Sequence, residues 1–368
     1  MPQVKEIAQF LERIAPLPLQ EGYDNSGLLV GEPDGEVQHV LVSLDMTEAV
    51  VAEAVDRGAQ MIVAHHPVIF KALRSLTGKN AVERTVMAAL RAGVALYAIH
   101  TNLDNVAHGV NAMMGRKLGL EAVKVLRPVK GHLRRVSVYV PDTEVETVCE
   151  AAWAAGAGRI GNYDRCSFRM SGEGTFRAGA SARPFVGEVG EIERAAEQRV
   201  EFAVESWAVS SVMASIFGAH PYEEVAHEIV EMQNAHPSAG AGGIGLLKRP
   251  MEWADFTAHV KQAFGAKLIR HTKPARSAVQ KIAFCGGTGS FLLPDAIAAG
   301  ADIFLSSDFK YHEFFDAEDR ITIVDIGHAE AEGGICDWLV GQLVEMKDGF
   351  PTFAVSLSTG STNPIYIA

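Results

Sequence analysis

The sequence lacks long hydrophobic runs. No apolar stretch in the 368 residues approaches the roughly 20 residues that a helix needs to cross a bilayer. The first residues, MPQVKEIAQFLERIAPL, alternate charged and apolar groups at helical spacing and contain no apolar signal-peptide centre. We therefore expect no membrane association, and we predict a cytoplasmic location.

Cysteine and positive charge are also scarce. The four cysteines are scattered without a C-x-x-C pair, which argues against a zinc knuckle and against a disulfide framework. We interpret all four as buried or partly buried thiols. The formal net charge of −12 provides no general attraction for a phosphate backbone, so the composition disfavours nucleic-acid binding. The cysteines are Cys149, Cys166, Cys285 and Cys336.

Familiar nucleotide and nucleophile motifs are missing as well. The glycine-rich turn CGGTGSF at 285–291 matches neither G-x-x-x-x-G-K-[ST] nor G-x-G-x-x-G. Its free amides suit either a bound phosphate or a tight turn without a ligand. There is no Ser-His-Asp arrangement and no nucleophile elbow.

What is present is an alternation of strands and helices. Residues 39–45, 61–67 and 94–100 are short apolar runs typical of buried strands, and apolar groups at helical spacing occupy 47–58 and 80–92. Strand–helix–strand alternation indicates right-handed βαβ units and a parallel sheet.

The second half of the chain repeats this pattern. Residues 58–66 align with 300–308, and the His-x-x-x-acid pattern of 100–104 recurs at 328–332. We interpret the repeat as a duplication of one α/β unit, with the common spacing of βαβ units as the alternative.

The middle of the chain has a different character. Residues 131–232 predict the order β-α-β-β-α-β, which is the ferredoxin-like arrangement. The expected fold class is thus α/β: a duplicated α/β unit with mostly parallel sheets, interrupted by an inserted ferredoxin-like domain. We place the first half of the α/β domain at 1–127, the insert at 128–246 and the second half at 247–368.

Five imidazole or carboxylate side chains follow the ends of predicted strands, where ligands bind in open α/β sheets. Histidine with carboxylate suits zinc, iron, manganese or nickel, whereas a closed structural zinc site would include thiolates. The pair at 328 and 332 lies on one side of a helical turn. The two carboxylates can bridge ions about 3.5–4 Å apart. We predict a two-metal site formed by His65, His66, Asp104, His328 and Glu332.

Other polar residues lie close to these ligands in the sequence. His100 and His312 are candidates for orienting a ligand or for transferring protons in catalysis. Asp308 and Lys310 either belong to the site or form an ordinary salt-bridged loop. Residues 220–224, HPYEE, are interpreted as a capped turn.

With these residues, the chain resembles the NIF-three-like family, dinuclear-metal proteins often labelled GTP cyclohydrolase I type two homologues. The insert resembles the PII/CutA-like domain of longer bacterial members, through CSFRMSGEGTFR (166–177) and GAHPYEEVAHEIV (218–230). The family resemblance rests on YDNSGLLVG (23–31), AHHPVIF (64–70), AIHTNLDN (98–105), FCGGTGSF (284–291), SSDFKYHE (306–313) and DIGHAEAE (325–332).

The resemblance implies the same five metal ligands, and it implies a toroidal homohexamer whose metal sites face an internal cavity. Segment 239–245, AGAGGIG, lacks the arginine expected in the family, so no anion-binding role is transferred to it. The family label implies opening of the guanine ring of GTP.

Two functions follow from these observations. The leading hypothesis is a hydrolase that uses two divalent metal ions per chain (zinc, iron or manganese) to attack an electrophilic carbon or phosphorus of a small heterocyclic or phosphorylated substrate. The alternative is a non-catalytic metal-binding or regulatory protein whose insert senses a small molecule.

Overall fold

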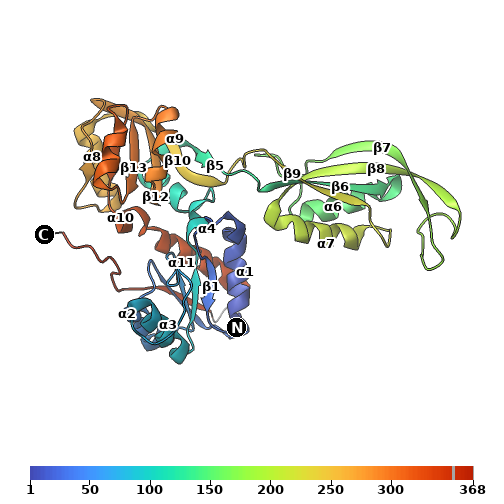
Figure 1. The fold of residues 1–368 in the computed structure, drawn as a ribbon, viewed down its shortest axis with the longest axis horizontal. Coiled ribbons are helices and arrows are strands. Elements are labelled where there is room, and N and C mark those ends of the chain that lie inside the picture. Colours follow the sequence, from blue (N-terminus) through green and yellow to red (C-terminus); the bar gives the residue numbers. More distant parts are fainter. Residues whose placement is uncertain (350–352, 368) are drawn as a thin grey trace. The chain divides into compact units, whose positions relative to one another are not determined.

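The computed structural model describes residues 1–349 and 353–367, and the chain divides into two units (Figure 1). The first unit combines residues 1–127 with 239–368, and the second comprises 128–238. The sequence analysis placed the second boundary after residue 246. In the structure it lies earlier, because Gly240–Glu252 forms β10, which pairs with β12 (Ala278–Thr288) in the first unit.

One sheet of the first unit is built from the N-terminal strands. Four of its five strands run parallel, and β1 pairs antiparallel with β4. The predicted strands at 39–45, 61–67 and 94–100 are all found here. In sheet order the strands are β1 (Gly27–Val30), β4 (Ala95–Ala98), β3 (Met61–Ala64), β2 (His39–Ser43) and β15 (Ala354–Leu357).

Every residue of β3 and β4 is buried. Ile62 and Leu96 pack toward α2 (Glu48–Asp56) and α3 (Ala81–Ala92) in one hydrophobic cluster. Successive side chains of a strand point to opposite faces, so the neighbouring buried residues belong to the other face of the sheet. A sheet buried on both faces explains why these strands are uninterrupted apolar runs.

The second sheet of this unit contains the strands of the segment that was interpreted as a repeat. Strands β12, β13 and β14 are parallel, while β10 and β11 pair antiparallel with β12 and β14. The predicted α/β class with mostly parallel pairing is confirmed in this unit. In sheet order the strands are β11 (Arg270–His271), β14 (Thr322–Asp325), β13 (Ile303–Ser307), β12, β10 and β5 (Leu120–Pro128).

Helices connect and cover these strands. The α-helices are α1 (Val4–Ile14), α4 (Thr101–Asp104), α5 (Val110–Lys117), α8 (Trp253–Phe264), α9 (Leu293–Ala298), α10 (His328–Glu332) and α11 (Ile335–Glu345). The short 3-10 helices are η1 (Leu17–Leu19), η4 (Ser290–Leu292), η5 (Tyr311–Ala317) and η6 (Met346–Gly349). No helix in the part of the chain that the structure describes is long and apolar enough to cross a membrane.

The second unit is a four-stranded antiparallel sheet with two helices on one face (Figure 1). Its elements follow one another in the predicted order β-α-β-β-α-β, and the strands lie in the order β7-β8-β6-β9. Short 3-10 helices η2 (Asp142–Glu144) and η3 (Ser206–Ala208) precede the two helices. The main elements are β6 (Leu133–Pro141), α6 (Val145–Ala154), β7 (Phe168–Arg177), β8 (Ile192–Glu205), α7 (Val209–Ala219) and β9 (His227–Met232).

Candidate metal centre

The five predicted ligands meet at the carboxyl ends of strands in the first unit. His65 and His66 directly follow β3, Asp104 is the last residue of α4 after β4, and His328 and Glu332 are the first and last residues of α10 after β14. The same strand-end geometry that motivated the prediction therefore brings these side chains together.

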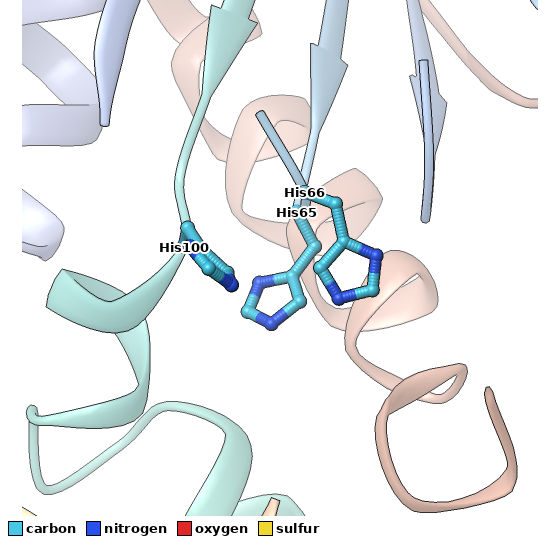
Figure 2. Close-up of side chains that lie close together, drawn as sticks. All are labelled: His65, His66 and His100. Atoms are coloured by element: carbon cyan, nitrogen blue, oxygen red, sulfur yellow. The ribbon is translucent and has the colours of Figure 1, made fainter. Parts of the chain in front are cut away.

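Histidine side chains lie in close contact at this edge. Figure 2 shows His65, His66 and His100 side by side just beyond the strand ends. The ring centroids of His65 and His66 are 5.0 Å apart, and those of His65 and His100 are 5.3 Å apart. His328 joins from α10, with its ring centroid 5.0 Å from that of His66.

Ligand atoms form three overlapping groups, within each of which all atoms lie within 4.8 Å of one another. Glu332 is shared by two of them, as are His65 and His66. A carboxylate shared between neighbouring groups suits a site for more than one ion. The groups are His65–His66–His100, His66–His328–Glu332 and His65–Asp104–Glu332.

The two adjacent histidines are oriented by different partners. His65 Nδ1 donates to the Ile99 carbonyl at 2.8 Å, so its Nε2 is left as an acceptor facing the carboxylates. His66 Nδ1 contacts Asp45 Oδ1 at 2.7 Å, and its Nε2 lies 2.9 Å from Glu332 Oε2. These contacts fix both rings, which is the arrangement usual around metal-binding histidines.

Two buried polar atoms in this cluster have no hydrogen-bond partner. They are His65 Nε2 and Asp104 Oδ1, which lie 3.7 Å apart. His65 Nε2 is also 3.6 Å from Glu332 Oε2. Buried polar atoms are normally hydrogen-bonded, and leaving them unpaired is costly. A cation placed between these lone pairs would satisfy both atoms, so the residues present fit a metal ion.

The charges of the cluster depend strongly on one another. Burial, together with the nearby Glu332 carboxylate, raises the pKa of Asp104 well above its usual value. Burial would also raise the pKa of Glu332, but the surrounding histidines hold it well below its usual value. Burial lowers the pKa of His65. The pKa values of the two carboxylates are therefore shifted in opposite directions, as expected for closely spaced acidic groups that interact with one another.

His66 and His328 are the basic members of the cluster. Burial opposes their charge, but hydrogen bonds to Asp45 and Glu332 raise the pKa of His66 to about 9. Hydrogen bonds to Asp308 and Glu332 raise the pKa of His328 to about 11. Because metal ligands must be deprotonated, protons on these rings compete with a metal ion.

Asp308 belongs to the site. Its Oδ2 lies 2.5 Å from His328 Nδ1 and accepts a hydrogen bond from the Thr288 hydroxyl at 3.0 Å. Its backbone is in the left-handed region, with φ 61°, which is uncommon outside glycine. Lys310 instead lies 4.0 Å from Glu313. Asp308 and Lys310 therefore do not form the salt bridge that the sequence analysis considered.

The sequence analysis missed two carboxylates that orient ring nitrogens. Asp45 contacts His66, and Asp24 Oδ1 lies 2.6 Å from His100 Nδ1. Asp45 closes the predicted strand 39–45, so the strand-end criterion that selected the ligands would also have selected it. Asp24 lies in the motif at 23–31 that supports the family resemblance, but nothing in its spacing points to His100.

His312 is the one predicted site residue that lies apart from the others. Its side chain is exposed on η5, with its ring edge against Tyr311 at 5.2 Å and stacked on Phe315 at 6.3 Å. His100, by contrast, lines the cavity at the metal centre.

That cavity has a volume of about 680 Å³. Aromatic side chains of Tyr23, Phe70 and Phe291 contribute to its wall, and no lysine or arginine lines it among residues 1–349 and 353–367. Gly287 leaves the space that the Glu332 carboxylate occupies, because a Cβ at this position would lie 2.4 Å from Glu332 Oε1. Residues 285–288 form the end of β12 rather than a tight turn, and the glycine at 287 is explained by its close packing against Glu332.

Comparisons with known proteins found relatives that match most of the chain. The family described as Duf34/NIF3 (NGG1p interacting factor 3) matches residues 2–364. A Halalkalibacterium halodurans protein named GTP cyclohydrolase 1 type 2 homolog is 37% identical over 324 residues, covering 88% of this chain and 87% of that protein. A Bacillus subtilis protein of the same name is 34% identical over 365 residues, covering 98% of this chain and 97% of that protein.

Solved structures give the same result for the fold. A crystal structure of a Bacillus cereus protein related to NIF3 has a TM-score of 0.88 and 34% identity, and the match covers 100% of this chain and 99% of that one. A Staphylococcus aureus protein structure has a TM-score of 0.76 and 26% identity, with 100% and 99% coverage.

Proposed function

Since the chain belongs to the Duf34/NIF3 family, we propose that it is a dinuclear metal-dependent hydrolase acting on a small heterocyclic substrate. The observation that carries this proposal is the pair of buried, unpaired ligand atoms, His65 Nε2 and Asp104 Oδ1, which face each other at the strand ends. Burying a polar atom that has no hydrogen-bond partner is unfavourable, and a bound cation would remove this desolvation cost for both atoms.

The five ligands divide naturally between two divalent ions. We propose zinc, iron or manganese, because imidazole and carboxylate suit all three. Bound divalent ions would polarise a substrate oxygen and lower the pKa of a water molecule to about 7. The ions would be held by His65, His66, Asp104, His328 and Glu332, with the two carboxylates completing or bridging them.

His100 is the proton-transfer candidate that the structure favours. It lines the cavity, and Asp24 fixes its ring by accepting from Nδ1 at 2.6 Å. An oriented imidazole next to a substrate cavity is well suited to general acid or base catalysis. His312 lies outside the cavity of its own chain, so a catalytic role for it would require a neighbouring subunit. The homohexamer implied by the family resemblance would provide one.

The cavity wall favours a ring over a phosphate ester. Tyr23 and Phe70 lie with their ring centroids 6.1 Å apart, and Phe291 also lines the cavity. Planar aromatic walls bind heterocycles well, whereas phosphate recognition normally uses lysine or arginine. The relatives' name suggests the guanine ring of GTP, and the described wall combines aromatic rings with no lysine or arginine, which favours recognition through the ring rather than through the triphosphate.

The second candidate is a non-catalytic metal-binding or regulatory protein. Its support is the separate second unit, residues 128–238, which has its own hydrophobic core. In that function the PII/CutA-like insert would sense a small molecule, and the metal ions would be structural.

Metal content measured on protein purified without chelator tests the leading proposal. We expect about two transition-metal ions per chain in the parent and a sharp loss in His328→Ala and Glu332→Ala. His271→Ala is the matched control, because His271 is exposed on β11, away from the cavity. A parent that stays below about a tenth of an ion after zinc, iron and manganese are supplied would refute the metal site.

Activity separates the two candidates. Metal-loaded parent would be assayed for hydrolysis of GTP, guanosine, cyclic amides and an aryl phosphate, with His100→Ala beside it. Turnover of a ring substrate that falls by 10²-fold or more in His100→Ala supports the hydrolase. Full metal content with no turnover of any of these substrates favours the regulatory function.

A further inference from the structure

The second unit contains a cavity of its own, with a volume of about 410 Å³. It lies between strands β7 and β8 and the turn that follows α7. Volumes of this size are typical of sites for small ligands. Its wall includes four aromatic side chains and three carboxylates, namely Tyr139, Phe176, Phe185, Tyr222, Glu197, Glu223 and Glu224.

Tyr222 is the centre of the aromatic wall. Its ring centroid lies 6.1 Å from that of Phe176 and 6.2 Å from that of Phe185, at interplanar angles of 60° and 53°. Three rings at steep angles to one another form a partial cage rather than a flat stack. Cages of this kind attract cations through the negative faces of the rings.

Glu197 supplies a negative charge beside this cage. Its Oε1 accepts a hydrogen bond from the Tyr222 hydroxyl at 3.0 Å. No lysine, arginine or histidine nitrogen within residues 128–238, all of which are described, forms a salt bridge with it. Glu201 on the same strand differs, because it pairs with Arg199 at 3.0 Å. The Glu197 carboxylate is therefore held in an aromatic pocket without a cationic partner.

The residues around Glu197 leave room for its carboxylate and add no positive charge beside it. A Cβ at Gly174 on the neighbouring strand would lie 2.2 Å from Glu197 Oε2, so glycine provides the space that the carboxylate occupies. The imidazole of His220 adds no charge. Its Nδ1 accepts from the Tyr222 amide at 3.1 Å and its Nε2 donates to the Tyr139 carbonyl at 2.9 Å, which describes a neutral ring.

We propose that this cavity binds a small organic cation, an ammonium group carrying apolar substituents. The substituents would contact the rings of Phe176, Phe185 and Tyr222, and the charge would lie against Glu197. The wall contains carboxylates and no lysine or arginine side chain, so anions such as nucleotides or oxo acids are disfavoured. The cavity shares no lining residue with the candidate metal centre.

The test uses the full chain and two probes of nearly equal shape. Choline carries the quaternary ammonium, and 3,3-dimethylbutan-1-ol is its uncharged isostere. By calorimetry or ligand-observed NMR, we expect choline to bind with a dissociation constant on the order of 1 mM or tighter, and the isostere at least about tenfold more weakly. Equal affinity for both probes, or no saturation by choline up to about 20 mM, would overturn the proposal.

Variants locate the charge and the cage. Glu197→Gln should weaken choline binding about tenfold and leave the isostere unchanged, whereas Glu173→Gln removes the same charge from an exposed position outside the cavity and should have little effect. Tyr222→Leu should weaken both probes, because it removes a ring. Circular dichroism confirms that each variant is folded. Equal losses in Glu197→Gln and Glu173→Gln would assign the effect to general electrostatics and contradict the site.

Discussion

The substitution Asp45→Asn tests whether the carboxylates behind the histidines set metal affinity. Asp45 Oδ1 accepts from His66 Nδ1 at 2.7 Å, and its Oδ2 accepts from the Thr362 hydroxyl at 2.5 Å. Accepting the Nδ1 proton leaves the His66 Nε2 lone pair free for a metal ion. Asparagine keeps the shape but loses the charge. If its amide nitrogen faces His66, the ring must place its proton on Nε2, where the proton blocks ligation.

Loss of such a supporting carboxylate typically costs 10–100-fold in metal affinity, or about 1.4–2.7 kcal/mol. We expect that loss for Asp45→Asn in a competition titration against a chelator of known zinc affinity. Asp34→Asn is the control, because Asp34 is an exposed carboxylate paired with Lys5. A change within about twofold of the parent, or an equal loss in Asp34→Asn, would refute the role assigned to Asp45.

Two further predictions follow from the cluster and the core. The pKa of His66 is raised to about 9 and that of His328 to about 11, so both rings are protonated at neutral pH without metal, and metal affinity should fall as pH decreases from 9 to 6. Calorimetry in buffers of different ionisation enthalpy should show proton release, and its absence would contradict these protonation states. Leu41 is fully buried in the core beside α2, so Leu41→Ala should lower the free energy of unfolding of the first unit by about 3 kcal/mol in urea unfolding. A decrease below about 1 kcal/mol would contradict this prediction and would show that neighbouring side chains fill the space left by the leucine.

The first sheet could be predicted from the sequence because burial on both faces leaves an unmistakable pattern. β3 and β4 are runs of apolar residues with no alternation, and between them lies a segment whose apolar residues recur at helical spacing. The boundary after residue 246 was wrong for a different physical reason. Segment 239–245 consists almost entirely of small residues, which is typical of a linker, but a Cβ at Gly243 would lie 2.4 Å from the Phe284 ring, so β10 needs glycine to pack closely.

The candidate ligands could be predicted to lie together because each follows a strand, and strand ends converge at one edge of a sheet. Spacing along the sequence does not pair the supporting carboxylates with their histidines, although Asp45 does lie at the end of a predicted strand. Asp45 and His66 are 21 residues apart, and Asp24 and His100 are 76 apart. A hydrogen bond over such separations has no sequence period, because it depends on how two loops pack. The candidate set therefore contained five side chains that gather in the structure, but it also contained His312, which lies apart, and it lacked Asp24 and Asp45.

The interpretation of the chain as a duplicated α/β unit is consistent with the similar short helices that the two halves bring to the site. His100 caps the start of α4 and Asp104 ends it, while His328 begins α10 and Glu332 ends it. The two halves thus present the same short helix after a strand. The two halves nevertheless contribute different side chains, because Asp308 aligns with His66 yet contacts His328 instead of joining the ligand groups. Two similar half-sites with different side chains produce one asymmetric centre, in which Glu332 is shared and each half completes the other.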